Sequence, residues 1–140
     1  MTFRSVYRLA SLFSFSFGFF AYLAIETVYK THFSTSKTHF SMGLIAGVAF
    51  FVLYFLDDKR LSFFFTMVVG ATLITLLELL SGLYLNLYLK LDIWDYRSMP
   101  FDLWGQICPT FSLIWLALSA LIILFNRFLK REIRFLCLCN

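Results

Sequence analysis

The chain has 140 residues, of which 61% are hydrophobic and 14% charged, against roughly 25% charged residues in soluble domains. A water-soluble domain of this length cannot bury so much apolar surface, so lipid must be its solvent and residues 1–140 form a single membrane domain. The net charge is +4, but no basic soluble module carries it, which argues against nucleic acid as a partner.

Four uncharged apolar segments are each near the ~20 residues that an α-helix needs to cross the hydrocarbon core. Spanning segments must pair their own backbone groups, which favours helices over strands for runs this uniformly apolar. The first segment is longer than the apolar region of a signal peptide, so we expect it to be a retained helix. The sequence therefore predicts an all-α polytopic membrane protein with four transmembrane helices, at about residues 9–29, 40–56, 61–89 and 107–126, and an outer loop at 90–106.

Basic residues predict the orientation of these helices. Eight of them lie on the side that carries both termini and four on the side of the outer loop, and an excess of Lys and Arg marks the cytoplasmic side. Both termini are therefore expected in the cytoplasm. The first set is Arg4, Arg8, Lys59, Arg60, Arg127, Lys130, Arg131 and Arg134, and the second is Lys30, Lys37, Lys90 and Arg97.

The cysteines and histidines give no clear metal or disulfide pattern. Cys108 is expected near the outer face, whereas Cys137 and Cys139 are expected inside, so the three cannot form one disulfide framework. His32 and His39 lie in the first outer loop without a fixed third ligand, which is a weak zinc signal. We expect reduced thiols and a solvated polar loop, with no metal and no cofactor.

Two glutamates interrupt the apolar segments, and each lies toward the end of a predicted helix. Glu26 follows Arg8 by 18 residues, and Glu78 follows Arg60 by the same number, which places both carboxylates about 27 Å from the inner boundary. A carboxylate in hydrocarbon is costly and usually faces the bundle interior or a wet cavity. We therefore predict that both glutamates face the interior, within reach of each other directly, through water or through Arg97.

The outer loop covers the same end of the predicted bundle. Its aromatic residues suit the membrane–water interface, and its proline and glycine give fixed bends; these loop residues are Trp94, Tyr96, Pro100, Trp104 and Gly105. Two close carboxylates under such a loop can share a proton or bind a cation. Alternatively, Arg97 or Lys90 neutralises them as a structural lock. The candidate ligand- or ion-binding residues are Glu26, Glu78, Asn86, Asp95, Arg97 and Asp102.

The stretch from Glu78 to Trp115 resembles a known family. Its signature here is Glu78, then Trp94-Asp95-Tyr96-Arg97-Ser98-Met99-Pro100-Phe101-Asp102-Leu103-Trp104-Gly105-Gln106-Ile107-Cys108, then Phe111-Ser112 and Trp115. This run is similar to that of small bacterial membrane proteins of the ABC-transporter permease (type IV) family. Arg97 stands where the family usually has Ser, Asp102 stands where it has Asn, and the family's Gly-, Asn- and Pro-rich entry to the second helix is not recognisable.

The resemblance implies a four-helix protein of the bacterial plasma membrane that takes part in transport. The chain has no phosphate-binding loop, no Ser nucleophile beside a His and no His-Glu-x-x-His motif, so we expect no enzyme. A membrane hydrolase using Glu78 and Asp95 is the enzymatic alternative. We predict a permease-like component that works with a partner ATPase or as a homo-oligomer in the lipid bilayer, on an unknown substrate. The alternative is a non-transporting interaction or assembly subunit whose acidic pocket is structural.

Overall fold

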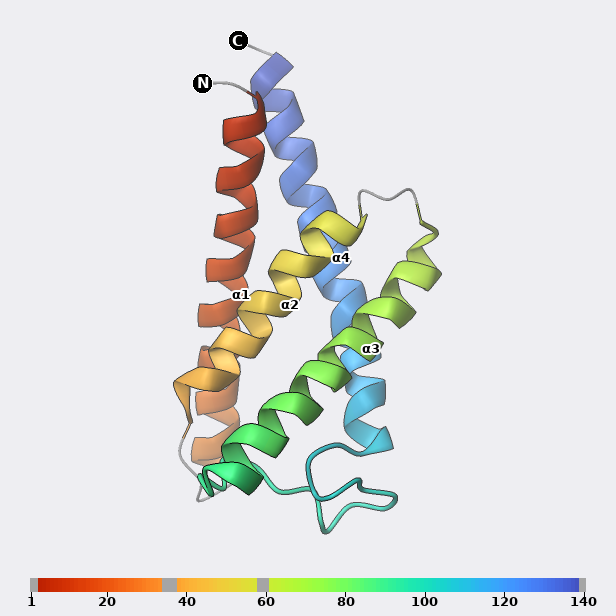
Figure 1. Cartoon of the computed structure of the whole chain (residues 1–140). Helices are drawn as coiled ribbons and strands as arrows, with labels where there is room; N and C mark the ends of the chain where they lie inside the picture. Colours follow the sequence, from red (N-terminus) through yellow and green to blue (C-terminus); the bar gives the residue numbers. More distant parts are fainter. Residues whose placement is uncertain (1–2, 34–37, 58–60, 139–140) are drawn as a thin grey trace.

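The computed structural model of the chain describes residues 3–33, 38–57 and 61–138 and confirms the all-α prediction (Figure 1). Its helices are α1 (Phe3–Phe33), α2 (Phe40–Leu56), α3 (Phe63–Gly82) and α4 (Pro109–Leu138), and α3 continues as a π-helical turn, η2 (Leu83–Tyr88). By length and composition, α1, α4 and the α3–η2 unit can each cross a membrane, and α2 is a shorter apolar helix of 17 residues. The expectations for Lys37, Lys59, Arg60 and Cys139 lie outside the described residues.

Two of the helices are longer than their apolar cores predicted. Helix α1 covers residues 3–33 rather than 9–29, and α4 ends at Leu138 rather than near residue 126. Charged residues end a hydrocarbon span but are good helix formers, so the helices continue past the apolar segments. The helix predicted at 61–89 instead begins at Phe63, where the Ser62 side chain accepts a hydrogen bond from the Phe65 amide, and becomes π-helical after Gly82.

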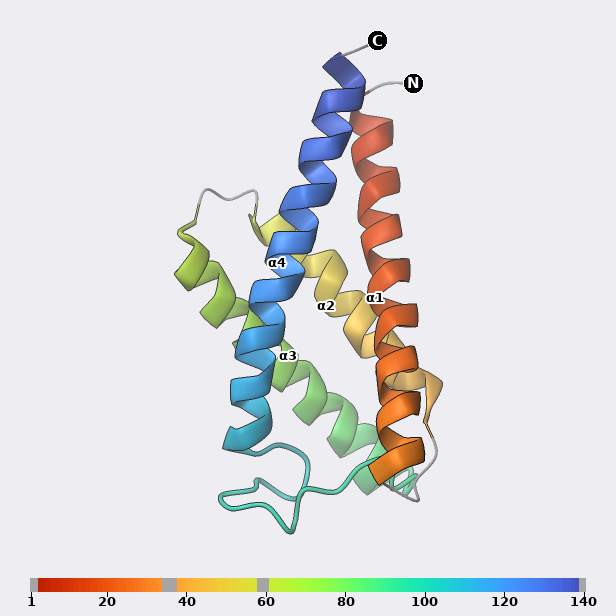
Figure 2. The same cartoon turned by 180° about the vertical axis from the view of Figure 1, so that it is seen from behind.

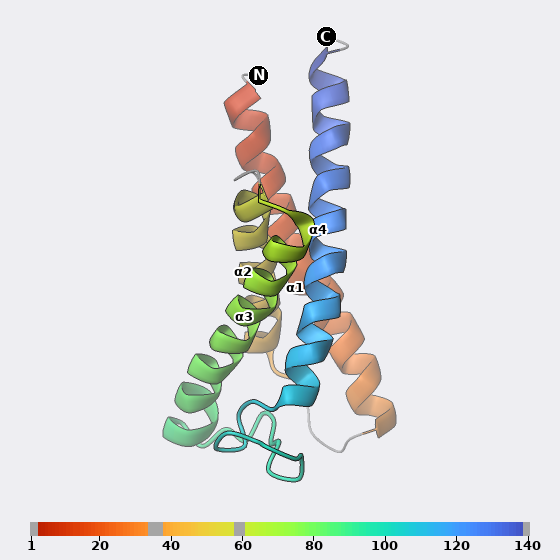
Figure 3. The same ribbon diagram turned by 90° about the vertical axis from the view of Figure 1, so that its right-hand side faces the viewer.

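Both termini lie at one end of the bundle and the loop between η2 and α4 lies at the other (Figures 1 and 2). Helix α1 packs most extensively along α2, and α3 along α4. Seen from the side, α1 and α4 extend beyond α2 and α3 at the end that carries the termini (Figure 3). This arrangement leaves the loop covering the end of the bundle farthest from the termini.

Small residues allow the helices to approach closely. A Cβ atom added at Gly43 would lie 2.8 Å from the Leu23 side chain, and one added at Gly47 would lie 2.9 Å from the Phe15 ring. Gly43 and Gly47 therefore form a Gly-x-x-x-Gly packing face on α2, and such small residues favour helix association in lipid, where the hydrophobic effect does not drive helices together. Deeper in the bundle, the Ser14 hydroxyl donates to Asn126 Oδ1 at 2.6 Å, so polar groups join α1 to α4 as well.

Candidate functional site

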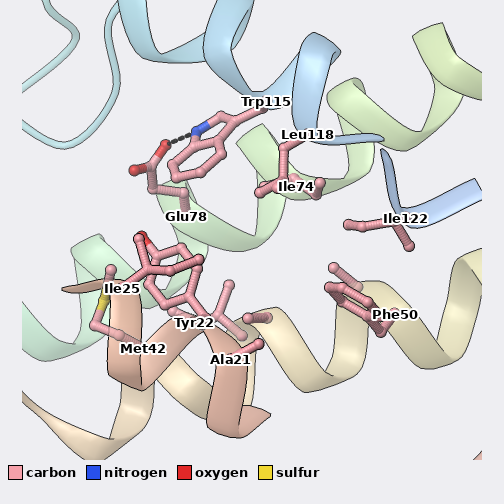
Figure 4. A pocket seen from close by; sticks show the side chains of 13 residues that line it. Ala21, Tyr22, Ile25, Met42, Phe50, Ile74, Glu78, Trp115, Leu118 and Ile122 are labelled. Carbon is pink, nitrogen blue, oxygen red and sulfur yellow. Dashed lines mark hydrogen bonds between the residues drawn. The ribbon is translucent and has the colours of Figure 1, made fainter. Parts of the chain in front are cut away.

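Glu78 lies on α3 and is 3% exposed, with both carboxylate oxygens in use. Its Oε1 accepts a hydrogen bond from the Tyr96 hydroxyl at 2.8 Å. Its Oε2 accepts one from Trp115 Nε1 at 2.7 Å, the bond drawn in Figure 4. Both donors are neutral. Within the described part of the chain, no Lys or Arg side chain forms an ion pair with Glu78.

Tyr96 is the residue through which the outer loop contacts this carboxylate. Its ring stacks on Phe111 with 4.4 Å between centroids, and its backbone amide donates to the Gly105 carbonyl at 2.8 Å. Burial, followed by the nearby charge of Glu78, raises the pKa of the Tyr96 phenol above its ordinary value. The phenol therefore stays protonated and acts as a hydrogen-bond donor to Glu78.

A partly open cavity of about 70 Å³ lies beside Glu78 and is lined by residues of all four helices. Its wall is mostly aliphatic, with Glu78, Tyr22 and Trp115 at one end (Figure 4). The rings of Tyr22 and Trp115 are 6.3 Å apart between centroids and tilted by 44°. The lining residues are Ala21, Tyr22, Ile25, Met42, Ile45, Ala46, Ala49, Phe50, Ile74, Glu78, Trp115, Leu118 and Ile122.

Glu26 is also buried, but it has a cationic partner. Its Oε1 lies 2.8 Å from Lys30 Nζ, one turn further along α1, and both side chains are at most 10% exposed. Lys30 Nζ also donates to the Ile93 carbonyl at 3.2 Å, which ties this ion pair to the loop. Tyr22 lies one turn before Glu26 on α1, and its side chain lines the same cavity as Glu78.

Arg97 instead forms an ion pair with Asp95 at the surface of the loop. The distance from Arg97 Nε to Asp95 Oδ2 is 3.0 Å, and the two side chains are 70% and 51% exposed. The Arg97 backbone amide also donates to Asp95 Oδ1 at 2.9 Å, and this bond lowers the pKa of the Asp95 carboxyl. The structure therefore separates these two candidate residues from Glu78, and Lys90 is exposed as well.

Asn86 and Gln106 form what we call the loop clamp, with the backbone of Ile93, Trp94 and Trp104. Asn86 Nδ2 donates to the Trp94 carbonyl and to Gln106 Oε1, both at 2.9 Å, and Asn86 Oδ1 accepts from the Ile93 amide at 2.8 Å. Gln106 Nε2 donates to the Trp104 carbonyl at 3.0 Å. The Asn86 amide is thus occupied in holding the loop against η2.

The remaining loop residues shape its turns. Asp102 Oδ2 accepts a hydrogen bond from the Gly105 amide at 2.7 Å. Gly105 has φ +70°, a left-handed conformation that glycine adopts without steric cost. Trp104 is 62% exposed and Pro100 is exposed, whereas Trp94 is half-buried and donates through Nε1 to the Gln106 carbonyl at 3.0 Å. Asp102 therefore stabilises a turn in the loop.

Four residues that contact the predicted site residues or line the cavity with them were absent from the candidate set: Tyr22, Lys30, Gln106 and Trp115. The spacing of Tyr22 and Lys30, four residues on either side of Glu26, places all three on one helix face and was available from the sequence. Gln106 and Trp115 lie in the stretch that resembles the family. They carry no charge, so the cost of burying a charged group, which identified the other candidates, did not identify them. Their roles depend on the crossing of α3 with α4 and on the path of the loop.

A second charged cluster lies near the termini. Asp57 is 5% exposed and accepts hydrogen bonds from Arg127 at 2.7 and 2.9 Å, and its other oxygen is 3.8 Å from Lys130 Nζ. Lys130 Nζ also donates to the Tyr54 carbonyl. The sequence placed all of these charges on one side of the membrane but did not predict that they pair. The pairing joins the end of α2 to α4.

No curated protein and no solved structure matches the chain. The family model described as "Putative ABC-transporter type IV" matches residues 8–137, a range that includes α2, α3, the loop and most of α1 and α4 as well as the signature around Glu78. Together with the apolar helices, this match identifies an ABC-transporter-type membrane protein. The chain belongs to the "Putative ABC-transporter type IV" family.

Proposed function

We propose that this chain is the membrane component of an ABC-type transport system and that Glu78 is the centre of its ligand site. The observation that carries the proposal is the contrast between the two buried glutamates. Glu26 has its own cation in Lys30, as a structural ion pair should. Glu78 has only neutral donors, and its side chain lines a cavity. A buried carboxylate that lacks a counter-charge is better explained by an exchangeable ligand or proton than by a lock.

An ABC-type system is driven by ATP hydrolysis, and this sequence has no phosphate-binding loop. We propose a separate ATPase subunit, and a four-helix chain is small enough to favour a homo-oligomer as well. The ATPase would act at the end that carries both termini. Basic residues occur in the parts of α1 and α4 nearest the termini, including Arg8, Arg127, Lys130 and Arg131, as expected for the cytoplasmic face of a bacterial plasma membrane.

The candidate residues of the loop have a supporting role in this proposal. Asn86 and Asp102 hold the loop in the form that places Tyr96 on Glu78, and the Asp95–Arg97 pair lies on its outer surface. The loop thereby covers the carboxylate on the side away from the termini.

The experiment compares Glu78→Gln with Asp95→Asn in proteoliposomes that contain the chain and its co-purified ATPase. Glutamine can still accept from Trp115 and can donate to the Tyr96 hydroxyl, so it removes the charge while both hydrogen bonds remain available. We expect Glu78→Gln to abolish the stimulation of ATP hydrolysis by the chain, and Asp95→Asn, at the exposed loop surface, to keep it. Equal stimulation by wild type and Glu78→Gln would contradict the proposal.

The second candidate is a non-transporting assembly subunit with a structural acidic pocket. The loop clamp favours it, because Asn86 makes three hydrogen bonds that only stabilise the fold. In that case partners co-purify with the chain, and neither their activity nor their binding depends on the charge of Glu78.

A further inference from the structure

We propose that the cavity between the four helices is a lipid site, which takes the end of an acyl chain from a membrane phospholipid. This inference goes beyond the proposed function and does not depend on it, because the acyl chain would contact the apolar wall of the cavity and not the Glu78 carboxylate.

The chemistry of the wall excludes water and polar ligands. All of the accessible wall is apolar, although Glu78, Tyr22 and Trp115 are among the lining residues. The Trp115 Nε1 donor is occupied by its hydrogen bond to Glu78. A buried water needs about two to four polar partners, and an apolar cavity that lacks them stays dry. The cavity therefore suits a ligand whose own surface is hydrocarbon.

The position of the cavity determines which hydrocarbon can reach it. Ile25 lines the cavity from α1 (Figure 4), is 65% exposed and lies within an apolar helix long enough to cross a membrane. Leu118 lines it from α4, is half-buried and lies nine residues from Arg127, or about 14 Å along the helix. Arg127 pairs with Asp57 where the apolar segments end, so Leu118 lies near the middle of a hydrocarbon core about 30 Å thick. The ends of lipid acyl chains meet at this depth, and the cavity is partly open.

The size of the cavity determines how much of an acyl chain can enter. Its volume is about 70 Å³, roughly half of the ~150 Å³ of an engineered apolar cavity that binds benzene. On that scale it has room for about three chain carbons and not for an aromatic ring.

The free energy of entry comes from packing. The hydrophobic effect contributes little, because the acyl chain leaves an environment that is already apolar. The atoms that line an empty space lack dispersion contacts, and the chain end supplies them. A weak gain is sufficient, because acyl chains are the solvent of the protein at this depth.

The test uses nanodiscs of phosphatidylcholine that carries a photoreactive diazirine at the end of one acyl chain. After illumination, tandem mass spectrometry identifies the residues of the protein that the chain end has labelled. Ile122 and Ile123 are adjacent on α4 and only 1% and 0% exposed, but Ile122 lines the cavity and Ile123 does not. We expect label on Ile122 and on Ile74, another lining residue that is 5% exposed. Ile123 should carry none, because a close-packed interior has no space for a chain.

Two substitutions fill the cavity from different helices, so the test does not depend on the folding of either one. Ala46→Leu on α2 and Ala21→Leu on α1 each add an isopropyl group at a lining position, which should leave no room for the chain end. Both should abolish the label on Ile74 and Ile122. The matched control is Ala117→Leu, because Ala117 is exposed on α4 and does not line the cavity. This variant should be labelled like wild type.

A second probe distinguishes a phospholipid from a free amphiphile. It is a fatty acid with the same terminal diazirine, added to nanodiscs of unmodified phosphatidylcholine. Label on Ile74 and Ile122 from the phospholipid probe, with or without label from the fatty acid, supports the proposal, whereas label from the fatty acid alone overturns it. The proposal is also overturned if the phospholipid probe labels only lipid-facing residues such as Leu113, if it labels Ile123 as strongly as Ile122, or if the cavity-filling variants are labelled like wild type.

Discussion

Replacing Asn86 by alanine tests whether one side chain on η2 holds the loop over Glu78. The change removes three hydrogen bonds, to the Ile93 amide, the Trp94 carbonyl and Gln106 Oε1. A net hydrogen bond contributes about 1 kcal/mol in soluble proteins and about 0.6 kcal/mol between membrane helices. The free energy that favours the closed loop over the open loop should therefore fall by about 2–3 kcal/mol, which corresponds to an increase of about 30- to 150-fold in the open fraction.

Hydrogen–deuterium exchange of the protein in nanodiscs measures this opening directly. The reporters are the amides of Tyr96 and Gln106, which donate to the Gly105 and Leu103 carbonyls. Both should exchange about 30- to 150-fold faster in Asn86→Ala, while amides in the middle of α1 keep their wild-type rates.

The matched control is Thr72→Ala, which removes an exposed hydroxyl that bonds only to the Val68 carbonyl of its own helix. It should leave the loop amides unchanged. The reasoning fails if Asn86→Ala accelerates the loop amides less than about threefold. It also fails if the whole bundle loses protection to the same extent, because the loop would then not be a separate unit.

Three further predictions address the carboxylates and the orientation. Glu78→Leu should destabilise the protein by about 2–5 kcal/mol in thermal or denaturant unfolding, because the buried Trp115 and Tyr96 donors lose their acceptor. Glu78→Gln should stay within about 1 kcal/mol of wild type. Equal losses in the two variants would contradict the role of Glu78 as the acceptor of these two hydrogen bonds. The lowered pKa of Asp95 means that its contribution to loop stability is complete above its ordinary pKa of 3.8 and is lost as the pH falls through the lower folded value; a carboxyl NMR titration with a midpoint at or above 3.8 would refute this. Ser98→Cys should react with an impermeant thiol reagent added outside intact cells, and protection there would reverse the proposed orientation.

Much of the fold follows from patterns that lipid imposes on any chain. Apolar length indicated four helices, whereas the contact of Gly43 and Gly47 on α2 with side chains of α1 was seen only in the structure. The helix ends were less predictable, because the charged residues after Asn126 continue α4 instead of ending it. The π-helical turn around Asn86 carries no signal in hydropathy.

The candidate site, like the fold, could be predicted from the sequence only in part. The cost of burying a carboxylate predicted from sequence alone that Glu26 and Glu78 face the interior, and both are less than 10% exposed. The sequence did not indicate which of them has a cation. Lys30 was available one turn from Glu26, but Arg97 was an equally reasonable partner until the loop path placed it beside Asp95.

The apolar helices and the burial of the two glutamates thus followed from the sequence, because each depends on local residue chemistry and on the cost of placing polar groups in lipid. The partners were decided by tertiary structure. Glu78 with Trp115 and Asp57 with Arg127 are separated by 37 and 70 residues, and they meet only because of how each helix is rotated and crossed against its neighbours. Side-chain packing sets that rotation, and residue spacing within a single helix does not specify it.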